Sequence, residues 1–366
     1  MAIDRYGELG VDYSVLDSSK RAAIAAARST SAFMSDHGGR VVEDSRGASA
    51  FVLELGDETL AFVVEGLGTK SIIAREWLAL TGEDRFADIG VDAVGAIVND
   101  VCSVGALPFV VNAYFATGRS DWHGGGSSLN SLIAGWRAAC EQSGAVWGGG
   151  ESPALPGLVS DTDIEVAGSC IGRLPKSWRP ILGDELADGD RIVLIESSGL
   201  HANGASIARS AAAGLADGFR TLLPSGEPFG AALLRPSIIY VPLIKKLSER
   251  GVRPTYLSHV TGHGFRKLMR AAAELTYVID APPPVPEVLV SLSEFAGFDQ
   301  RAAYGTFNMG AGFAVYVRPA DVDAVVGAAA ECGLRALPSG WVQAGKRSVE
   351  LPTLGITFDG DELDLR

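Results

Sequence analysis

The sequence predicts an α/β protein, of the α+β type, with two domains. The chain has 366 residues, and because a single core rarely serves so long a chain, its length favours two domains of roughly 150–200 residues each. Strand-like and helix-like segments alternate from about residue 51 onward. Residues 173–190 carry proline, glycine and charge without periodicity. We therefore predict an N-terminal domain at 1–174 and a C-terminal domain at 175–366.

In the first half, apolar runs bounded by turn residues predict strands at 59–65, 108–118 and 163–172. Segments with helical spacing of apolar residues lie between them, at 70–80 and 127–144. This order of elements is typical of a mixed sheet covered by helices.

The second half restarts the alternation. We predict strands at 191–197 and 310–317, and helices at 204–216, 236–250 and 321–333. No period of 20 to 50 residues recurs in the sequence, which argues against a solenoid or a propeller.

Composition excludes several classes of partner. The net charge of −13 argues against nucleic acid and anionic membranes, which bind clustered Lys and Arg. No apolar run approaches the roughly 20 residues of a membrane span, and the start of the chain lacks a signal-peptide pattern, so we expect a cytoplasmic protein. The four cysteines form no C-x-x-C pair and are predicted to be reduced core residues.

The stretch FVVEGLGTKS at 62–71 ends a strand at Glu65 and begins a helix near Lys70. Gly66 and Gly68 permit backbone conformations that bring N–H groups close to an anion, and the following helix N-terminus favours phosphate. The spacing is not that of a Walker A loop. An ordinary strand-to-helix turn remains an alternative for this short pattern.

The segment DIGVDAVGAIVNDVCSVGALP predicts a helix on which Asp92, Asn99 and Asp100 share one face. Their neighbours are apolar or small, and a buried carboxylate is costly unless it is paired or bound to metal. Two acids and an amide suit Mg²⁺. The alternative is a polar stripe that faces solvent.

Glu151 follows three glycines, Gly149 among them, and precedes two prolines. We expect no regular element to persist there, and the glycines would let this loop pass close to a ligand. A solvated loop carboxylate is the alternative.

In the second half, the turn ESSGLHANGAS carries Ser198, His201 and Asn203 between a strand and a helix. These side chains can bind a polar ligand, and His can move a proton near neutral pH. Such residues are also common in ordinary turns.

The stretch LSHVTGHGF repeats this pattern with His259, Thr261 and His263, and Asn308 lies in a glycine-rich turn before a strand. The two histidines have a helical metal spacing, but the adjacent glycines make a helix improbable and the zinc context H-E-x-x-H is absent. We therefore do not favour zinc here.

Taken in order, these stretches resemble the aminoimidazole ribonucleotide synthetase family, also called phosphoribosylformylglycinamidine cyclo-ligases. The resemblance runs over nearly the whole chain and rests on seven motifs: YGELGVD, GLGTK, IGVDAVGAIVNDVCSVGALPFVVNAYFATG, GGGESPALPG with VAGSCIG, SSGLHANG, SHVTGHGF and YGTFNMGAG. One motif alone would be weak, whereas seven in one order are specific.

The resemblance implies an N-terminal ATP-binding domain whose strands form a β-barrel across a homodimer, and a C-terminal α/β sandwich domain that binds substrate. It implies an ATP-dependent ligase of purine biosynthesis. In that reaction ATP phosphorylates the formamide oxygen of formylglycinamidine ribonucleotide, and an amidine nitrogen closes the imidazole ring with release of ADP and phosphate.

The resemblance also assigns residues. ATP and Mg²⁺ would be bound by Glu65, Gly66, Gly68, Lys70, Asp92, Asn99, Asp100, Gly149 and Glu151, with Glu65, Asp92 and Asp100 as metal ligands. The ribonucleotide would contact Ser198, His201, Asn203, His259, Thr261 and Asn308. Catalytic roles would fall to Asp100, His201 and His259.

The chain departs from the family pattern at several places. Glu65 and Glu165 stand where the family usually has Asp, and residues 34–51 replace a glycine-rich loop. Ile24 or Ala25 falls where a Lys is expected, and His263 interrupts a run of glycines. These changes leave two alternatives open, namely a paralogue that activates another carbonyl substrate with ATP, and a catalytically silent dimeric nucleotide-binding protein.

Overall fold

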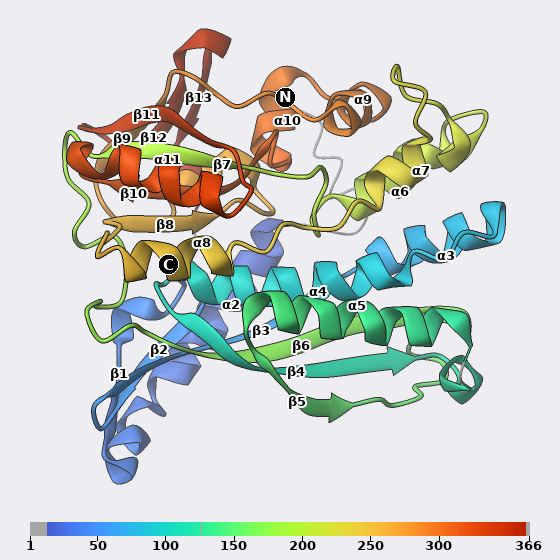
Figure 1. Ribbon diagram of the computed structural model, residues 1–366, viewed down its shortest axis with the longest axis horizontal. Coiled ribbons are helices and arrows are strands. Elements are labelled where there is room, and N and C mark those ends of the chain that lie inside the picture. Colours follow the sequence, from blue (N-terminus) through green and yellow to red (C-terminus); the bar gives the residue numbers. More distant parts are fainter. Residues whose placement is uncertain (1–12, 125, 364–366) are drawn as a thin grey trace.

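The computed structural model describes residues 13–124 and 126–363. Two mixed β-sheets, one in each half of the chain, lie on either side of a layer of helices (Figure 1). The α/β class with two sheet-containing units is thus confirmed. All strands of the first sheet end by Arg173 and those of the second begin at Arg191. The exact boundary at 174/175 stays a prediction.

The first sheet has six strands in the order β1-β2-β3-β6-β4-β5. The central pairs β3–β6 and β6–β4 are antiparallel, and the edge pair β4–β5 is parallel. The strands are β1 (Gly39–Val41), β2 (Phe51–Leu55), β3 (Glu58–Gly66), β4 (Leu107–Thr117), β5 (Val146–Glu151) and β6 (Ile164–Arg173).

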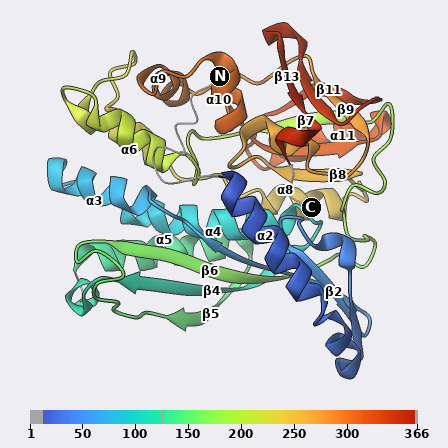
Figure 2. The ribbon, with the colours of Figure 1, turned by 180° about the vertical axis from the view of Figure 1, so that it is seen from behind.

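Helices cover one face of this sheet, as Figures 1 and 2 show from opposite sides. Along β6 every second residue is buried, and Ala61 and Val63 of β3 are buried in the same alternating way, as expected for a sheet packed on one face. Helix α4 lies over the centre of the sheet, beside α5. The helices of this half are α2 (Tyr13–Arg28), α3 (Lys70–Thr81), α4 (Phe86–Cys102) and α5 (Ser127–Ser143).

The second sheet has seven strands in the order β13-β12-β9-β11-β7-β10-β8. They are β7 (Arg191–Glu196), β8 (Tyr256–His259), β9 (Leu275–Ile279), β10 (Ala311–Val317), β11 (Ala336–Ala344), β12 (Ser348–Leu351) and β13 (Ile356–Asp359). The helices are α6 (Ala205–Ala213), α7 (Phe229–Leu233), α8 (Val241–Glu249), α9 (Glu287–Phe295), α10 (Gln300–Thr306) and α11 (Val322–Glu331).

Most predicted elements are present, and two predictions are wrong. The helix predicted at 236–250 begins only at Val241, because the backbone before it is bound to side chains of the first half. Residues 148–151, predicted to be irregular, form the end of β5. Glycine allows this pairing, since a Cβ on Gly150 would lie 2.0 Å from the Ala113 carbonyl oxygen.

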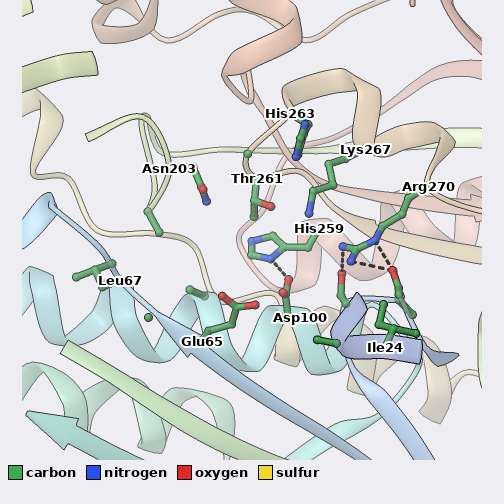
Figure 3. Close-up of a pocket in the computed structure, with 18 residues that line it drawn as sticks. Ile24, Glu65, Leu67, Asp100, Asn203, His259, Thr261, His263, Lys267 and Arg270 are labelled. Atoms are coloured by element: carbon green, nitrogen blue, oxygen red, sulfur yellow. Dashed lines mark hydrogen bonds and ion pairs between the residues drawn. The ribbon is translucent and has the colours of Figure 1, made fainter. Parts of the chain in front are cut away.

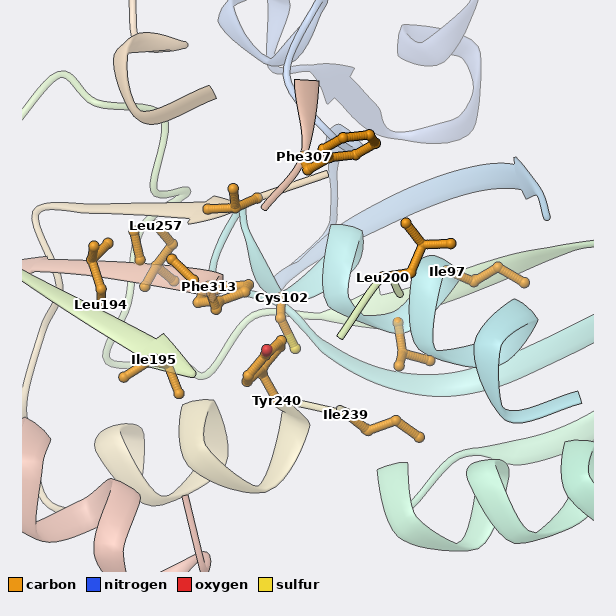
Figure 4. Packing of buried hydrophobic residues seen from close by; sticks show 14 of the residues in the cluster. Ile97, Cys102, Leu194, Ile195, Leu200, Ile239, Tyr240, Leu257, Phe307 and Phe313 are labelled. Carbon is orange, nitrogen blue, oxygen red and sulfur yellow. The ribbon is translucent and has the colours of Figure 1, made fainter. Parts of the chain in front are cut away.

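A continuous apolar core joins the two halves. Ile97 and Cys102 of α4 belong to the same buried cluster as Leu257 and Phe313 of the second sheet, with Tyr240 between them (Figure 4). Of the other cysteines predicted for the core, Cys140 and Cys170 are buried and free, as predicted. Cys332 is free but only partly buried, so the core prediction is wrong for this residue. In the described part of the chain, no helix is both long enough and apolar enough to cross a membrane.

The segment 235–240 connects the halves through polar contacts as well. The ammonium of Lys70 donates to the Arg235 carbonyl oxygen at 3.1 Å and pairs with Asp92 at 2.6 Å. The other oxygen of Asp92 accepts the Ser237 N–H at 2.8 Å and its hydroxyl at 2.5 Å. Both charged side chains are fully buried. Burial raises the pKa of Asp92, while Lys70 and Ser237 oppose that rise.

Asn99, further along helix α4, also binds backbone groups of segment 235–240. Its amide donates to the Ile238 carbonyl oxygen at 2.8 Å and accepts the Tyr240 N–H at 2.9 Å. Together these side chains satisfy backbone groups that a helix over 236–240 would have satisfied internally. They explain why helix α8 starts late.

We expect Asp92→Asn to lower the free energy of unfolding by about 3–5 kcal/mol, because it leaves the buried ammonium of Lys70 without its counter-charge. Urea unfolding followed by circular dichroism measures the change. In the double variant Lys70→Met/Asp92→Asn the stranded charge is gone, so much of the loss should be recovered. Wild-type stability in Asp92→Asn would contradict a structural ion pair.

Candidate functional site

A cavity of about 510 Å³ lies between the two halves of the chain. Residues from both sides line it, and the sequence-predicted site residues among them are Glu65, Gly66, Asp100, Asn203, His259 and Thr261. Figure 3 shows Glu65 and Asp100 on the wall formed by the first half, with His259, Thr261 and Lys267 reaching from the second. The cavity therefore joins four of the motifs that the sequence analysis singled out.

Two carboxylates meet at the floor of this cavity. Burial and the neighbouring charge of Asp100 raise the pKa of Glu65 to about 8, although Lys267 acts in the opposite direction. Burial alone would raise the pKa of Asp100 as well, but the hydrogen bond and charge of His259 hold it below its ordinary value. Since like charges repel in a desolvated site, the two acids together favour positive charge beside them.

His259 is oriented by Asp100. Its Nδ1 lies 2.6 Å from an Asp100 carboxylate oxygen. Because an ionised carboxylate only accepts hydrogen bonds, Nδ1 is the nitrogen that carries the proton, and Nε2 is left for the cavity. A neutral His259 can thus accept a proton at Nε2, as a general base requires.

The oxygen ligands fit a hard cation better than zinc. Within the described ranges, no group of three or more His, Cys, Asp and Glu side chains has metal-binding geometry. Mg²⁺ is bound in proteins by one or two carboxylates, with water and phosphate oxygens completing the shell. Glu65 and Asp100 would supply those carboxylates, and the cation would add positive charge beside them.

Two basic residues in the cavity lining were missed by the sequence analysis. Lys267 and Arg270 follow the second histidine motif, in and after a short 3₁₀ helix at Gly264–Met269. The stretch HGFRKLMR has no periodicity that marks an inward-facing Lys. Its concentration of basic residues in an otherwise acidic chain was the available signal.

Glu165, the second Glu that stands where the family usually has Asp, stabilises the glycine turn after β3. The carboxylate of Glu165 accepts the Gly68 N–H, and burial is the main reason why its pKa is raised. Gly68 has φ +72°, a conformation that favours glycine. Thr69 precedes α3 without a capping bond and instead contacts the Ser206 hydroxyl at 3.0 Å.

Six of the predicted nucleotide ligands, Gly68, Lys70, Asp92, Asn99, Gly149 and Glu151, lie outside the cavity lining. Lys70, Asp92 and Asn99 are buried and engaged with segment 235–240, as described above. A cation at Asp92 would have to displace Lys70 and Ser237. Glu65 and Asp100 therefore stay candidate metal ligands, whereas the contacts of Asp92 indicate a structural role.

Residues of the second-half turns also divide into two groups. Asn203 and Thr261 line the cavity. Ser198 donates its hydroxyl to the Pro236 carbonyl oxygen at 2.6 Å. The side-chain oxygen of Asn308 accepts from Ser197, and its nitrogen donates to the Gly199 carbonyl at 2.7 Å. Ser198 and Asn308 thus hold the turn that presents Asn203.

His201 lies behind the cavity wall. Its Nε2 accepts the Ser198 N–H at 3.1 Å, and the residue has φ +59°. Burial, with the nearby charges of His259 and Lys70, lowers the pKa of His201 well below its ordinary value. A neutral ring with Nε2 already bonded supports the turn but is poorly placed for proton transfer.

Gly149 and Glu151 lie on the exposed edge strand β5, away from the cavity lining. The departures Ile24 and His263, by contrast, both line the cavity. Three of the departures, Ile24, Glu65 and His263, therefore lie at the site itself.

Comparison with known proteins gives a consistent result. Models of the AIR synthase related protein family match residues 47–174 (N-terminal domain) and 187–351 (C-terminal domain). A phosphoribosylformylglycinamidine cyclo-ligase of Methanothermobacter thermautotrophicus is 34% identical over 83% of this chain and 86% of its own length. Proteins with the same name from Lachnospira eligens and Bacillus subtilis are each 32% identical, over 82% of this chain and 86% and 82% of theirs.

Solved structures share the fold at lower identity. AaThiL complexed with AMPPCP and TMP is 16% identical, with a TM-score of 0.59 over 85% of this chain and 89% of that one. Hydrogenase maturation protein HypE in complex with ATP is 18% identical, with a TM-score of 0.57 over 81% and 83%. At this identity the likeness establishes the fold alone.

The raised pKa of Glu65 predicts a pH-dependent stability difference. A carboxyl whose folded pKa exceeds its unfolded value stabilises below the unfolded pKa, and that contribution is lost as pH rises toward 8. Glu65→Gln, measured against wild type by urea unfolding in EDTA, should gain in relative stability from pH 5 to pH 8. The exposed control Glu249→Gln should show the same change of unfolding free energy with pH as wild type. If Glu65→Gln also shows the wild-type change, the raised pKa of Glu65 is contradicted.

Proposed function

Because the chain belongs to the AIR synthase related family, we propose that it is an ATP-dependent ligase that converts formylglycinamidine ribonucleotide to aminoimidazole ribonucleotide. The observation that carries the proposal is the cavity that gathers the carboxylates of the first half and the polar turns of the second. Identity of 32–34% to cyclo-ligases over most of the chain supports this substrate.

ATP and Mg²⁺ are the proposed cofactors. Glu65 and Asp100 would hold the metal, and a metal bound there would supply positive charge for the phosphate oxygens of ATP. The backbone at Gly66 lies in the cavity lining, where it would contact an anion bound there. The formamide oxygen attacks phosphorus, ADP leaves, and the carbon becomes electrophilic.

Ring closure then requires a base. The amidine nitrogen attacks the activated carbon, and His259 Nε2 takes the proton that this nitrogen loses, while the phosphorylated oxygen leaves as phosphate. Asp100 stabilises the imidazolium through Nδ1 at 2.6 Å. Asn203 and Thr261 supply hydrogen-bonding groups to the ribonucleotide from the second half.

The assay is direct. Purified protein with ATP, Mg²⁺ and formylglycinamidine ribonucleotide should release ADP and form the aminoimidazole product in equal amounts. ATP turnover without ring closure would indicate a paralogue that acts on another carbonyl substrate. Failure to bind ATP would favour the catalytically silent alternative.

Asp100→Asn should lower kcat/KM at least 100-fold, because it removes both a metal ligand and the partner that orients His259. Steady-state ADP release measures the effect, and circular dichroism verifies the fold. Asp217→Asn, on the exposed surface, is the matched control. Wild-type turnover in Asp100→Asn would remove this residue from the proposed site.

We also propose a homodimer formed through the first sheet. Several apolar side chains on this sheet are exposed, among them Phe62, Val64, Phe109, Tyr114 and Val146. Contiguous exposed apolar surface on a sheet, next to an edge strand such as β5, is typical of an interface. Gly149 and Glu151 would then lie at the seam, where the family resemblance leads us to expect nucleotide.

Val64→Asp should convert the dimer to a monomer, since the 76% exposed Val64 side chain would become a charge at the proposed interface. Analytical ultracentrifugation measures the mass, and an unchanged circular dichroism spectrum shows that the sheet still folds. Leu222→Asp, an exposed apolar position of the second half, should leave the dimer intact. A dimer that survives Val64→Asp would place the interface elsewhere.

A further inference from the structure

The backbone around Lys267 is held in place by hydrogen bonds to neighbouring elements. This residue lies in the 3₁₀ helix at Gly264–Met269, where its own carbonyl oxygen accepts the Ser258 hydroxyl at 2.9 Å. Before it, the Arg266 guanidinium donates to the Gly305 carbonyl oxygen at 2.6 Å. The backbone that carries Lys267 is therefore fixed to two neighbouring elements.

Arg270 fixes the other side of the same segment. Its guanidinium donates to the Gly47 carbonyl oxygen at 3.0 and 3.2 Å and to the Ser49 hydroxyl at 2.7 Å. These bonds span from the second half to the loop before β2 and occupy much of the Arg270 donor capacity. Arg270 thus serves to hold the cavity wall closed.

Lys267 instead has its ammonium directed into the cavity (Figure 3). Its side chain is only 8% exposed, so its charge acts in a partly desolvated space. It favours the ionised forms of both Glu65 and Asp100. Without a bound metal, Lys267 is the counter-ion of Glu65 and Asp100 in the cavity.

A divalent cation on Glu65 and Asp100 would replace Lys267 in that role. The metal adds positive charge to a lining that already holds Lys267 and Arg270 against two carboxylates. The excess charge suits a phosphate dianion, and Lys commonly binds phosphate as a point charge.

We propose that Lys267 binds a phosphate group of the ligand in this cavity, and that a divalent cation on Glu65 and Asp100 releases it for that contact. The inference rests on the proposed function for its metal, yet its binding test is independent of turnover. The phosphate belongs either to the nucleotide or to the sugar phosphate of the substrate.

Isothermal titration calorimetry with Mg²⁺ tests the proposal, using inorganic phosphate, ribose 5-phosphate and AMPPCP as separate probes. Lys267→Met should weaken at least one probe about 10-fold or more, since a charged hydrogen bond is lost. Lys267→Arg should stay within about threefold of wild type because it keeps the charge. The exposed Lys245→Met is the control.

A second measurement distinguishes anion binding from a structural role. Without phosphate, Lys267→Met should bind Mg²⁺ as tightly as wild type or more tightly, because a competing cation is removed. Weakened Mg²⁺ binding together with weakened phosphate binding would indicate a damaged wall and overturn the proposal, as would unchanged binding of all three probes in Lys267→Met.

The probes also separate the two phosphate sources. Selective loss of AMPPCP binding assigns Lys267 to the nucleotide, whereas selective loss of ribose 5-phosphate assigns it to the substrate. If wild type binds phosphate through Lys267 but forms no aminoimidazole product, the proposed reaction fails while this inference stands. If the wild type forms the aminoimidazole product and Lys267→Met binds all three probes as tightly as wild type, the proposed reaction stands while this inference fails.

Discussion

The structure depends on one set of buried contacts, the attachment of segment 235–240 to helices α3 and α4. Lys70, Asp92 and Asn99 bind main-chain groups of this segment, and the core runs on through Tyr240. A buried ion pair is costly to break once formed, because either partner alone would be an uncompensated charge. These contacts therefore fix how the second half sits on the first, and with it the width of the cavity between them.

The same helix carries structure and chemistry on adjacent residues. Consecutive side chains point about 100° apart around a helix, so Asn99 faces the segment 235–240 while Asp100 faces the cavity. Asp100 then orients His259, which arrives on β8 from the other half. The distance between acid and imidazole is thus set by the interface that Asn99 helps to hold, and a shift of the halves would separate them.

The sequence predicted the secondary-structure elements and the motifs better than it predicted which groups each side chain contacts. Strands such as β3 and helices such as α5 follow from periodicity, which reports the face that is buried. The stripe Asp92, Asn99 and Asp100 was correctly expected to be costly if buried, but its members divide between two tasks. Asn99 binds two backbone groups of segment 235–240, and Asp92 binds the Ser237 N–H besides the Lys70 ammonium and the Ser237 hydroxyl. A main-chain partner leaves no residue-type signal. Lys267 was missed because its inward direction comes from the anchoring of Arg266 and Arg270, which is a tertiary effect.

The departures from the family pattern concentrate where charge is balanced. Ile24 lines the cavity at a place where the resemblance led us to expect a Lys, and Lys267 enters from the opposite wall. Glu65 and Glu165 each extend a carboxylate by one methylene. Glu165 uses that reach on the Gly68 N–H, while burial, together with the neighbouring charge of Asp100, raises the pKa of Glu65 to about 8. The longer side chain of Glu65 and the position of Lys267 on the other wall are consistent with each other. A positive charge that lies on a different side of the cavity requires the negative charge to shift as well. Under the proposed function these charges would suit a metal and a phosphate, and they come from different elements of the chain, Glu65 from β3, Asp100 from α4 and Lys267 from the segment Gly264–Met269.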